Sequence, residues 1–234
     1  MLRAFLFDFD GVIVDNEPLH CKVFQKILKE DGMSLTQEDY YQRYLGYDDI
    51  ACLQAIFKDQ GKKVDTQMVL ELARKKELVF KQEIDQGMRF VPGVIEFIRA
   101  LSNHYYIAIV SGALRSEIDI VLAQAGISDL VSVIVSALDV KQGKPSPEGY
   151  LMALRLLNRD HVPASEVVLT QECLVFEDSP WGLQAASSAQ MPAVALTTSY
   201  DKAKLSGALE WIENFSACSI AWIDALEGRI SHGH

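Results

Sequence analysis

The sequence is short of positive charge. Lys and Arg together number 22 against 32 Asp and Glu, so the formal net charge at pH 7 is -10. A field of this sign repels nucleic acid and anionic membrane surfaces, and we therefore expect neither as a partner. A phosphorylated small molecule is repelled too, unless cations are placed locally to receive it.

Long apolar runs and closely paired cysteines are also missing. The apolar run near the start is short and is broken by Asp8 and Asp10, so it predicts neither a membrane anchor nor a secretory signal. The cysteines show no spacing typical of a metal clip or a redox motif, and we expect them to be reduced; they are Cys21, Cys52, Cys173 and Cys218. These absences favour a soluble, cytoplasmic protein.

An acidic segment directly follows the first apolar run. Residues 4–7 are typical of a short strand buried on both faces, and this strand ends on Asp8, with Asp10 and Gly11 close behind. Turn chemistry accounts for Asp10 and Gly11 but leaves Asp8 unexplained, a carboxylate at the tip of a core strand. Two acids this close imply a metal, a cationic substrate group, or one acid that stays protonated.

The next part of the chain has only helical patterns. Apolar spacing, caps and breakers predict helices at 17–32, 36–45, 48–59 and 65–86. A purely helical block of about seventy residues between strands is best interpreted as an inserted bundle. We therefore predict a helical domain at 17–88, inserted into a core domain formed by 1–16 and 89–234.

From residue 92 onward, helices and strands alternate. Strands are predicted at 105–110, 131–135, 173–176 and 193–196, and helices at 94–101, 115–125, 147–157 and 181–189. The segments 203–209 and 211–226 are expected to be helical or irregular, with Trp211, Ile212 and Phe215 forming a packing patch. This alternation predicts an α/β protein with a Rossmann-like parallel sheet covered by helices on both faces, and the first strand must join this sheet.

Polar residues follow the predicted strands. In an open parallel sheet, ligands bind at the carboxyl ends of the strands, and those ends carry Asp8, Ser111-Gly112 and Glu177-Asp178, with Lys144 shortly after the strand at 131–135. Each has an ordinary explanation alone: a helix cap, a solvated loop lysine, or acids at a helix start. Together with Asp10 they predict one site containing a hydroxyl, an ammonium and four carboxylates.

These residues resemble, in order and spacing, the motifs of the haloacid dehalogenase superfamily. The motifs are Asp8-Phe9-Asp10-Gly11-Val12 with Asp15, then Ser111, Lys144-Pro145 and Glu177-Asp178-Ser179. The helical insertion after the first motif resembles the cap domain of the β-phosphoglucomutase-like branch. Four ordered motifs are a strong signal where one would be weak, and the resemblance covers nearly the whole chain up to about residue 200.

The resemblance implies phosphoryl transfer, since a dehalogenase proper lacks the second acid of the first motif. It makes Asp8 the nucleophile that forms an aspartyl-phosphate and Asp10 the general acid and base. The expected Mg²⁺ ligands are Asp8, Asp10 through its main-chain carbonyl, Glu177 and Asp178. The phosphoryl oxygens would be held by Ser111, the amides of Gly112 and Ala113, and Lys144.

The expected function is a Mg²⁺-dependent phosphatase, a phosphoric monoester hydrolase that acts on a small phosphorylated metabolite, with a sugar phosphate the expected substrate. Substrate choice is expected to reside in the cap, where the candidate residues are Glu17, His20, Gly46 and Tyr47. His20 is equally well interpreted as a helix-surface histidine, and Gly46 as a helix terminator. A monomer suits a cap that opens and closes.

Two alternatives stand beside hydrolysis. β-Phosphoglucomutases resemble this chain, but their cap loop carries a lysine before the glycine and an arginine three residues after it, where this chain has Leu45 and Asp49. Without that pair of cations a mutase cannot hold a second phosphate, so we favour hydrolysis. The other alternative is a non-catalytic sugar-phosphate-binding protein, which would need neither the nucleophile nor the acid.

Overall fold

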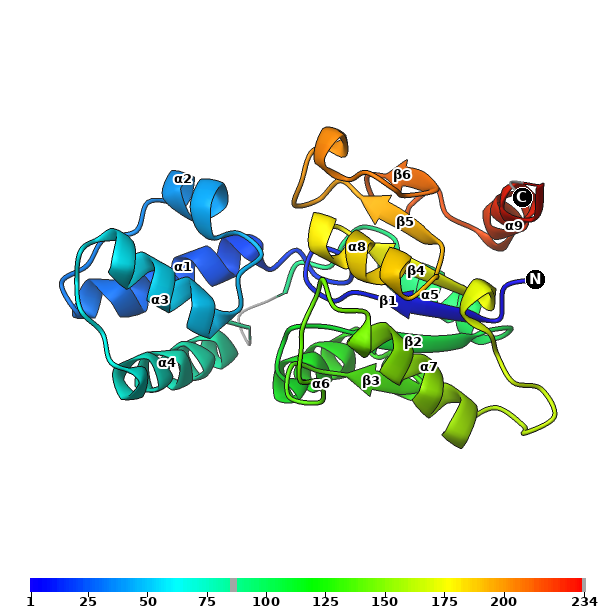
Figure 1. Cartoon of the computed structure of the whole chain (residues 1–234), viewed down its shortest axis with the longest axis horizontal. Coiled ribbons are helices and arrows are strands. Elements are labelled where there is room, and N and C mark those ends of the chain that lie inside the picture. The colour runs from blue at the N-terminus through cyan, green and yellow to red at the C-terminus, as the bar shows by residue number, and fades with distance from the viewer. Residues whose placement is uncertain (85–87, 233–234) are drawn as a thin grey trace. The chain divides into compact units, whose positions relative to one another are not determined.

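The computed structural model describes residues 1–84 and 88–232. The chain divides into two compact units, each with its own core (Figure 1). The core unit consists of Met1–Asp15 and Phe90–His234, and the cap unit of Asn16–Arg89. Within the described ranges, no helix combines the length and the apolar character needed to cross a membrane.

The core unit is built on a parallel sheet with β1 near its centre. Its strands are β1 (Ala4–Phe7), β2 (Tyr106–Val110), β3 (Val133–Val135), β4 (Cys173–Glu177), β5 (Ala193–Leu196) and β6 (Glu210–Ile212), in the order β3-β2-β1-β4-β5-β6. This doubly wound order changes direction between β1 and β4, and the carboxyl ends of the strands at such a point are where open parallel sheets bind ligands. The predicted fold class, a Rossmann-like parallel sheet with an inserted helical bundle, is confirmed.

The sixth strand corrects the sequence prediction. The segment expected to be helical or irregular from residue 211 contains β6, whose Trp211 pairs with Ala195 of β5, and the last helix begins only at Ile220. A three-residue edge strand whose residues are all half-buried has too few positions to show a period of two. Sheet pairing, rather than local pattern, decides its conformation.

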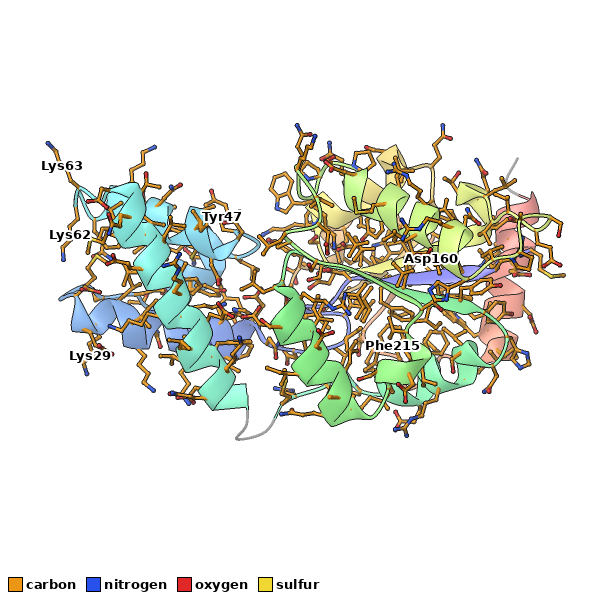
Figure 2. All side chains as sticks on the ribbon, turned by 90° about the horizontal axis from the view of Figure 1, so that it is seen from below. Lys29, Tyr47, Lys62, Lys63, Asp160 and Phe215 are labelled. Atoms are coloured by element: carbon orange, nitrogen blue, oxygen red, sulfur yellow. The ribbon has the colours of Figure 1, made fainter. Side chains whose placement is uncertain are left out.

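Helices cover both faces of the sheet (Figure 1). They are α5 (Val94–Ser102), α6 (Arg115–Ala125), α7 (Glu148–Asp160), α8 (Pro180–Ser188) and α9 (Ile220–His232). Residues of α7 and α8 pack on the face that carries Leu6. On the opposite face, Phe97 and Phe215 (the latter labelled in Figure 2) stack with ring centroids 5.3 Å apart and pack against Phe176. Phe215 is buried as predicted, but the expectation of one patch with Trp211 and Ile212 is corrected, because Trp211 packs against the cluster on the Leu6 face.

The cap unit is entirely helical within the described residues. It contains α1 (Glu17–Glu30), α2 (Gln37–Asp39), a π-helical turn (Tyr40–Tyr44), α3 (Asp49–Asp59) and α4 (Thr66–Ile84). Pro18 is tolerated in the first turn of α1, and the Asp48 side chain begins α3 by accepting from the Ala51 amide at 2.7 Å. The predicted end of the fourth helix at residue 86 lies outside the described residues.

Candidate active site

Asp8 lies at the carboxyl end of β1, beside the point where the strand order changes direction. The Asp8 amide donates to the Phe176 carbonyl of β4 at 2.9 Å, and Asp8 is buried. The chain then turns tightly, because the amides of Val12, Ile13 and Val14 all donate to the Phe9 carbonyl. The strand and this turn hold the Asp8 carboxylate at the carboxyl end of the sheet.

Lys144 provides the cation at this site. Its Nζ lies 2.6 Å from Asp8 Oδ1 and 2.5 Å from Glu177 Oε1. The lysine side chain is largely buried. The predicted convergence of the first, third and fourth motifs is therefore present in the structure as a carboxylate–ammonium–carboxylate cluster.

Burial raises the pKa of Asp8 to about 7, from an ordinary value of 3.8. The ammonium of Lys144 opposes this rise, while the charges of Glu177 and Asp10 add to it. Burial alone would lower the pKa of Lys144, but the two carboxylates outweigh it and raise that pKa above its ordinary value. The lysine therefore stays charged, and the Asp8 carboxylate is held in an environment with a surplus of negative charge.

Three buried carboxylates have the arrangement of a metal site. One oxygen from each of Asp8, Glu177 and Asp178 lies within 4.8 Å of the others. With all three ionised, the single ammonium of Lys144 leaves two negative charges uncompensated, and a divalent cation with a preference for oxygen ligands fits that surplus. The donor set and its charge thus suit Mg²⁺.

Two hydroxyl residues that sequence reasoning missed support Asp178. Ser199 Oγ donates to Asp178 Oδ2, and Thr198 Oγ1 donates to the Gly11 carbonyl at 2.6 Å. Gly11 is required here: it has a φ of +75°, and a Cβ at this position would lie 1.8 Å from Asp178 Oδ2. Thr198 and Ser199 follow the carboxyl end of β5, so the same strand-end rule that found Asp8 could have found them.

The segment after β2 carries three of the residues predicted to hold a phosphoryl group. Ser111 is buried and its amide donates to the Val135 carbonyl of β3 at 2.9 Å, which places it at the expected sheet edge. The amide of Ala113 donates to Ser111 Oγ at 2.9 Å, because the chain turns back on the serine. The roles of Ser111 and of the Gly112 and Ala113 amides toward a phosphoryl oxygen stay predictions.

The cap candidates all lie in the cap unit, where Glu17 and His20 have side-chain partners and Gly46 has a conformational role. Glu17 accepts a hydrogen bond from the Tyr40 hydroxyl at 2.8 Å, and the His20 ring stacks on Phe80 with centroids 4.4 Å apart. Gly46 has a φ of +82°, as a helix terminator requires. Tyr47 is half exposed (labelled in Figure 2). Their role toward a substrate remains a prediction.

Comparison with known proteins identifies the protein family. A profile of the haloacid dehalogenase-like hydrolases matches residues 5–196, which is most of the chain and includes all four motifs. The chain therefore belongs to the haloacid dehalogenase-like hydrolases, and the resemblance drawn from the motifs is confirmed.

Three individual proteins illustrate what the chain is similar to within this family. The chain is 29% identical over 192 residues to a phosphorylated carbohydrates phosphatase of Thermotoga maritima, covering 80% of this chain and 82% of that one, which supports the predicted class of phosphoric monoester hydrolase. It is 30% identical over 210 residues to the chloroplastic protein SUPPRESSOR OF QUENCHING 1 of Arabidopsis thaliana, of which it spans only 19%. The crystal structure of a β-phosphoglucomutase from Clostridium difficile superposes with a TM-score of 0.83 at 26% identity, over 98% of both chains.

Proposed function

We propose that this protein is a Mg²⁺-dependent phosphatase that hydrolyses a small phosphorylated metabolite, with a sugar phosphate as the expected substrate, through an aspartyl-phosphate intermediate. The observation that carries the proposal is the pairing of the Asp8 carboxylate with the Lys144 ammonium beside Asp178. A carboxylate, a cation and a metal-binding acid at one strand end are the parts that phosphoryl transfer needs.

In the first step, an oxygen of Asp8 attacks phosphorus and the bond from phosphorus to the ester oxygen breaks. The Asp10 carboxyl group gives its proton to the departing oxygen, so the alcohol leaves neutral. Asp10 follows Asp8 by two residues in the same turn, and its charge is close enough to raise the pKa of Asp8. That proximity supports its assignment as the acid.

In the second step, the Asp10 carboxylate takes a proton from water, and the water oxygen attacks phosphorus. The bond between phosphorus and the Asp8 oxygen breaks, which releases inorganic phosphate and restores both carboxyl groups to their starting states. One residue thus serves as acid and then as base, and the net reaction consumes one water for each ester bond broken.

Asp8, Asp178 and the main-chain carbonyl of Asp10 would hold Mg²⁺, with Glu177 as a further predicted ligand. When bound, the metal offsets the repulsion between the Asp8 carboxylate and the phosphoryl group. Lys144 and Ser111, with the amides of Gly112 and Ala113, would hold the phosphoryl oxygens and stabilise the charge that develops on them.

We further propose that residues 17–88 form a cap domain that selects the substrate, in a protein that acts as a monomer. Glu17, His20, Gly46 and Tyr47 are the residues proposed to contact the substrate beyond its phosphate. An acid, an imidazole and a phenol suit the hydroxyl groups of a sugar, since each can donate or accept a hydrogen bond.

The direct test is release of phosphate from an aryl phosphate and from a panel of sugar phosphates. We expect hydrolysis that requires Mg²⁺, stops on addition of EDTA and returns when Mg²⁺ is restored. No metal-dependent release from any member of the panel would contradict the proposal and favour a non-catalytic binding protein.

A mutase is kept as a second candidate because of the likeness to β-phosphoglucomutase. Against it stand Leu45 and Asp49, which replace the two cations of the mutase loop, and Asp49 lies 2.9 Å from Lys76 within the cap unit. Incubation with β-glucose 1-phosphate and a bisphosphate primer decides between the two. We expect free phosphate, whereas accumulation of glucose 6-phosphate would favour the mutase.

A further inference from the structure

A buried tyrosine outside the four motifs contacts the centre of the proposed site. Tyr150 lies on α7, is fully buried, and donates its hydroxyl to Glu177 Oε1 at 2.8 Å. The Lys144 ammonium reaches the same oxygen and also lies 5.4 Å from the centre of the Tyr150 ring. Tyr150 therefore contacts both the acid of the fourth motif and the lysine of the third.

Glu177 is held from every side by groups of the protein itself. Its Oε2 accepts from the amides of Asp178 and Ser179 at 3.0 and 3.2 Å, and from Ser179 Oγ at 3.0 Å. A Cβ on Gly182 would lie 1.8 Å from the Glu177 Oε1, so the glycine makes room for this carboxylate. Oε2 thus fixes the loop that carries Asp178, and Oε1 is shared between the Tyr150 hydroxyl and Lys144.

The hydroxyl is what distinguishes Tyr150 from a phenylalanine at the same position. The residue otherwise belongs to the apolar cluster between α7 and the sheet, where phenylalanine would fill the same space without a polar atom to satisfy. The phenol is the donor in this contact, because a carboxylate oxygen can only accept. The Tyr150 hydroxyl and the Lys144 ammonium share Glu177 Oε1 as their acceptor. The hydrogen bond from Tyr150 therefore weakens the attraction between Glu177 and Lys144.

We infer that Tyr150 is a positioning residue, whose hydroxyl bond to Glu177 Oε1 holds the Lys144 ammonium between Glu177 and Asp8. With the hydroxyl removed, Lys144 is the one remaining donor among those described at Oε1. The ammonium then moves toward Glu177 and away from Asp8 Oδ1. It is thereby displaced from the position in which it would contact the phosphoryl group. Tyr150 is hydrogen-bonded to neither Asp8 nor Asp178, and Glu177, the further predicted ligand, keeps the three donors at its Oε2, so the affinity for Mg²⁺ should change little.

The substitution Tyr150→Phe tests this, with Tyr106→Phe as the matched control. Tyr106 is a half-buried residue of the same unit and lies at the amino end of β2, away from the strand ends that carry the site. Calorimetric titration with Mg²⁺ alone gives the dissociation constant and the fraction of competent protein, by which kcat on an aryl phosphate is normalised. The kinetic arm rests on the proposed phosphatase function.

For Tyr150→Phe we expect kcat to fall roughly 10- to 100-fold, the scale of a catalytic group displaced by about 1 Å. KM and the Mg²⁺ dissociation constant should change by less than about twofold, because the contact is lost mainly in the transition state. Tyr106→Phe should match the wild type. A normalised kcat within about twofold of wild type, or a raised KM with kcat intact, would overturn the inference.

A crystal structure of the Tyr150→Phe protein separates this inference from the proposed function, because it needs no activity. We expect the Lys144 Nζ to leave hydrogen-bond distance of Asp8 Oδ1 and to approach Glu177. An unmoved ammonium would overturn the positioning role whatever the enzyme hydrolyses. A moved ammonium in a protein whose wild type releases no phosphate would instead leave the inference standing and contradict the phosphatase proposal.

Discussion

The core and cap units both bury a lysine beside acids, but they balance its charge differently. In the core unit, Lys144 faces Asp8 and Glu177, with Asp178 close to both. In the cap unit, the fully buried Lys76 pairs with one carboxylate, Asp49, at 2.9 Å. The core cluster therefore carries surplus negative charge, while the cap pair is neutral.

This difference separates a reactive site from a structural one. Burial, together with the neighbouring charges of Glu177 and Asp10, raises the pKa of Asp8 to about 7; such perturbation is typical of sites that bind a metal or substrate. The cap ammonium is instead enclosed by one counter-ion and by the rings of Phe80 and Phe24, 4.7 and 5.7 Å away. We interpret Lys76 as part of the cap's core.

The largest expected effect is that of Asp8→Asn. An amide cannot attack phosphorus as a carboxylate does, so the rate of phosphate release per mole of protein should fall by about 10⁴-fold or more. The folded state should persist, because the replacement removes a buried charge without changing the shape of the side chain. The control is Asp160→Asn, at an exposed acid where α7 ends (labelled in Figure 2), which should leave the rate unchanged. Hydrolysis that survives Asp8→Asn would assign the nucleophile to another residue.

The next effect concerns the proton donor. Asp10→Ala should slow turnover of a sugar phosphate by about 10²–10⁴-fold, the usual contribution of general acid–base catalysis. An aryl phosphate, whose leaving group needs less protonation, should lose less. Mg²⁺ affinity should be nearly retained, because the proposed ligand from this residue is its main-chain carbonyl. Equal losses on both substrates would argue against an acid role in the first step.

A smaller effect is expected from the support behind Asp178. Ser199→Ala removes the hydroxyl that donates to Asp178 Oδ2, and loss of such an outer contact typically weakens metal affinity by about 10–100-fold. Calorimetric titration with Mg²⁺ measures it directly. Ser188→Ala, at the exposed end of α8, is the control and should bind Mg²⁺ as the wild type does. An unchanged affinity in Ser199→Ala would mean that Asp178 is oriented without this bond.

The smallest effect on activity is expected from the cap pair. Asp49→Asn leaves the buried Lys76 ammonium without its counter-ion and should destabilise the cap unit by about 3 kcal/mol. Lys76→Met keeps the apolar stem and leaves Asp49, whose side chain is 30% exposed, in contact with water, so it should cost less. Turnover of a small aryl phosphate should change little in either variant.

Hydrogen exchange distinguishes the two units in this experiment. Amides of α1, α3 and α4 should lose protection in Asp49→Asn, while tryptophan fluorescence should report an unchanged core, since Trp181, Trp211 and Trp222 all belong to the core unit. A loss of turnover comparable to that of the core variants would contradict the structural role of Lys76. Greater destabilisation by Lys76→Met than by Asp49→Asn would contradict the charge account.

Elements with a strong local pattern could be predicted closely. The α1 start at Glu17, the α6 span Arg115–Ala125 and the β5 span Ala193–Leu196 agree with expectation, because caps, glycines and apolar runs lie within a few residues of one another. The strand β6 could not be predicted, because its pairing with β5 lies outside its own three residues. Prediction from local sequence pattern uses only residues that are close together along the chain.

The residue types of the candidate site could be predicted from the sequence, because Asp8 and Asp178 follow strands, Asp10 and Lys144 lie shortly after strands, and parallel strands bring such ends to one edge of the sheet. How these groups are paired could be seen only in the folded protein. The bond from Tyr150 to Glu177 and the bond from Ser199 to Asp178 join segments that are more than twenty residues apart in the sequence. A motif specifies which groups are present, whereas packing in three dimensions fixes which oxygen each donor meets.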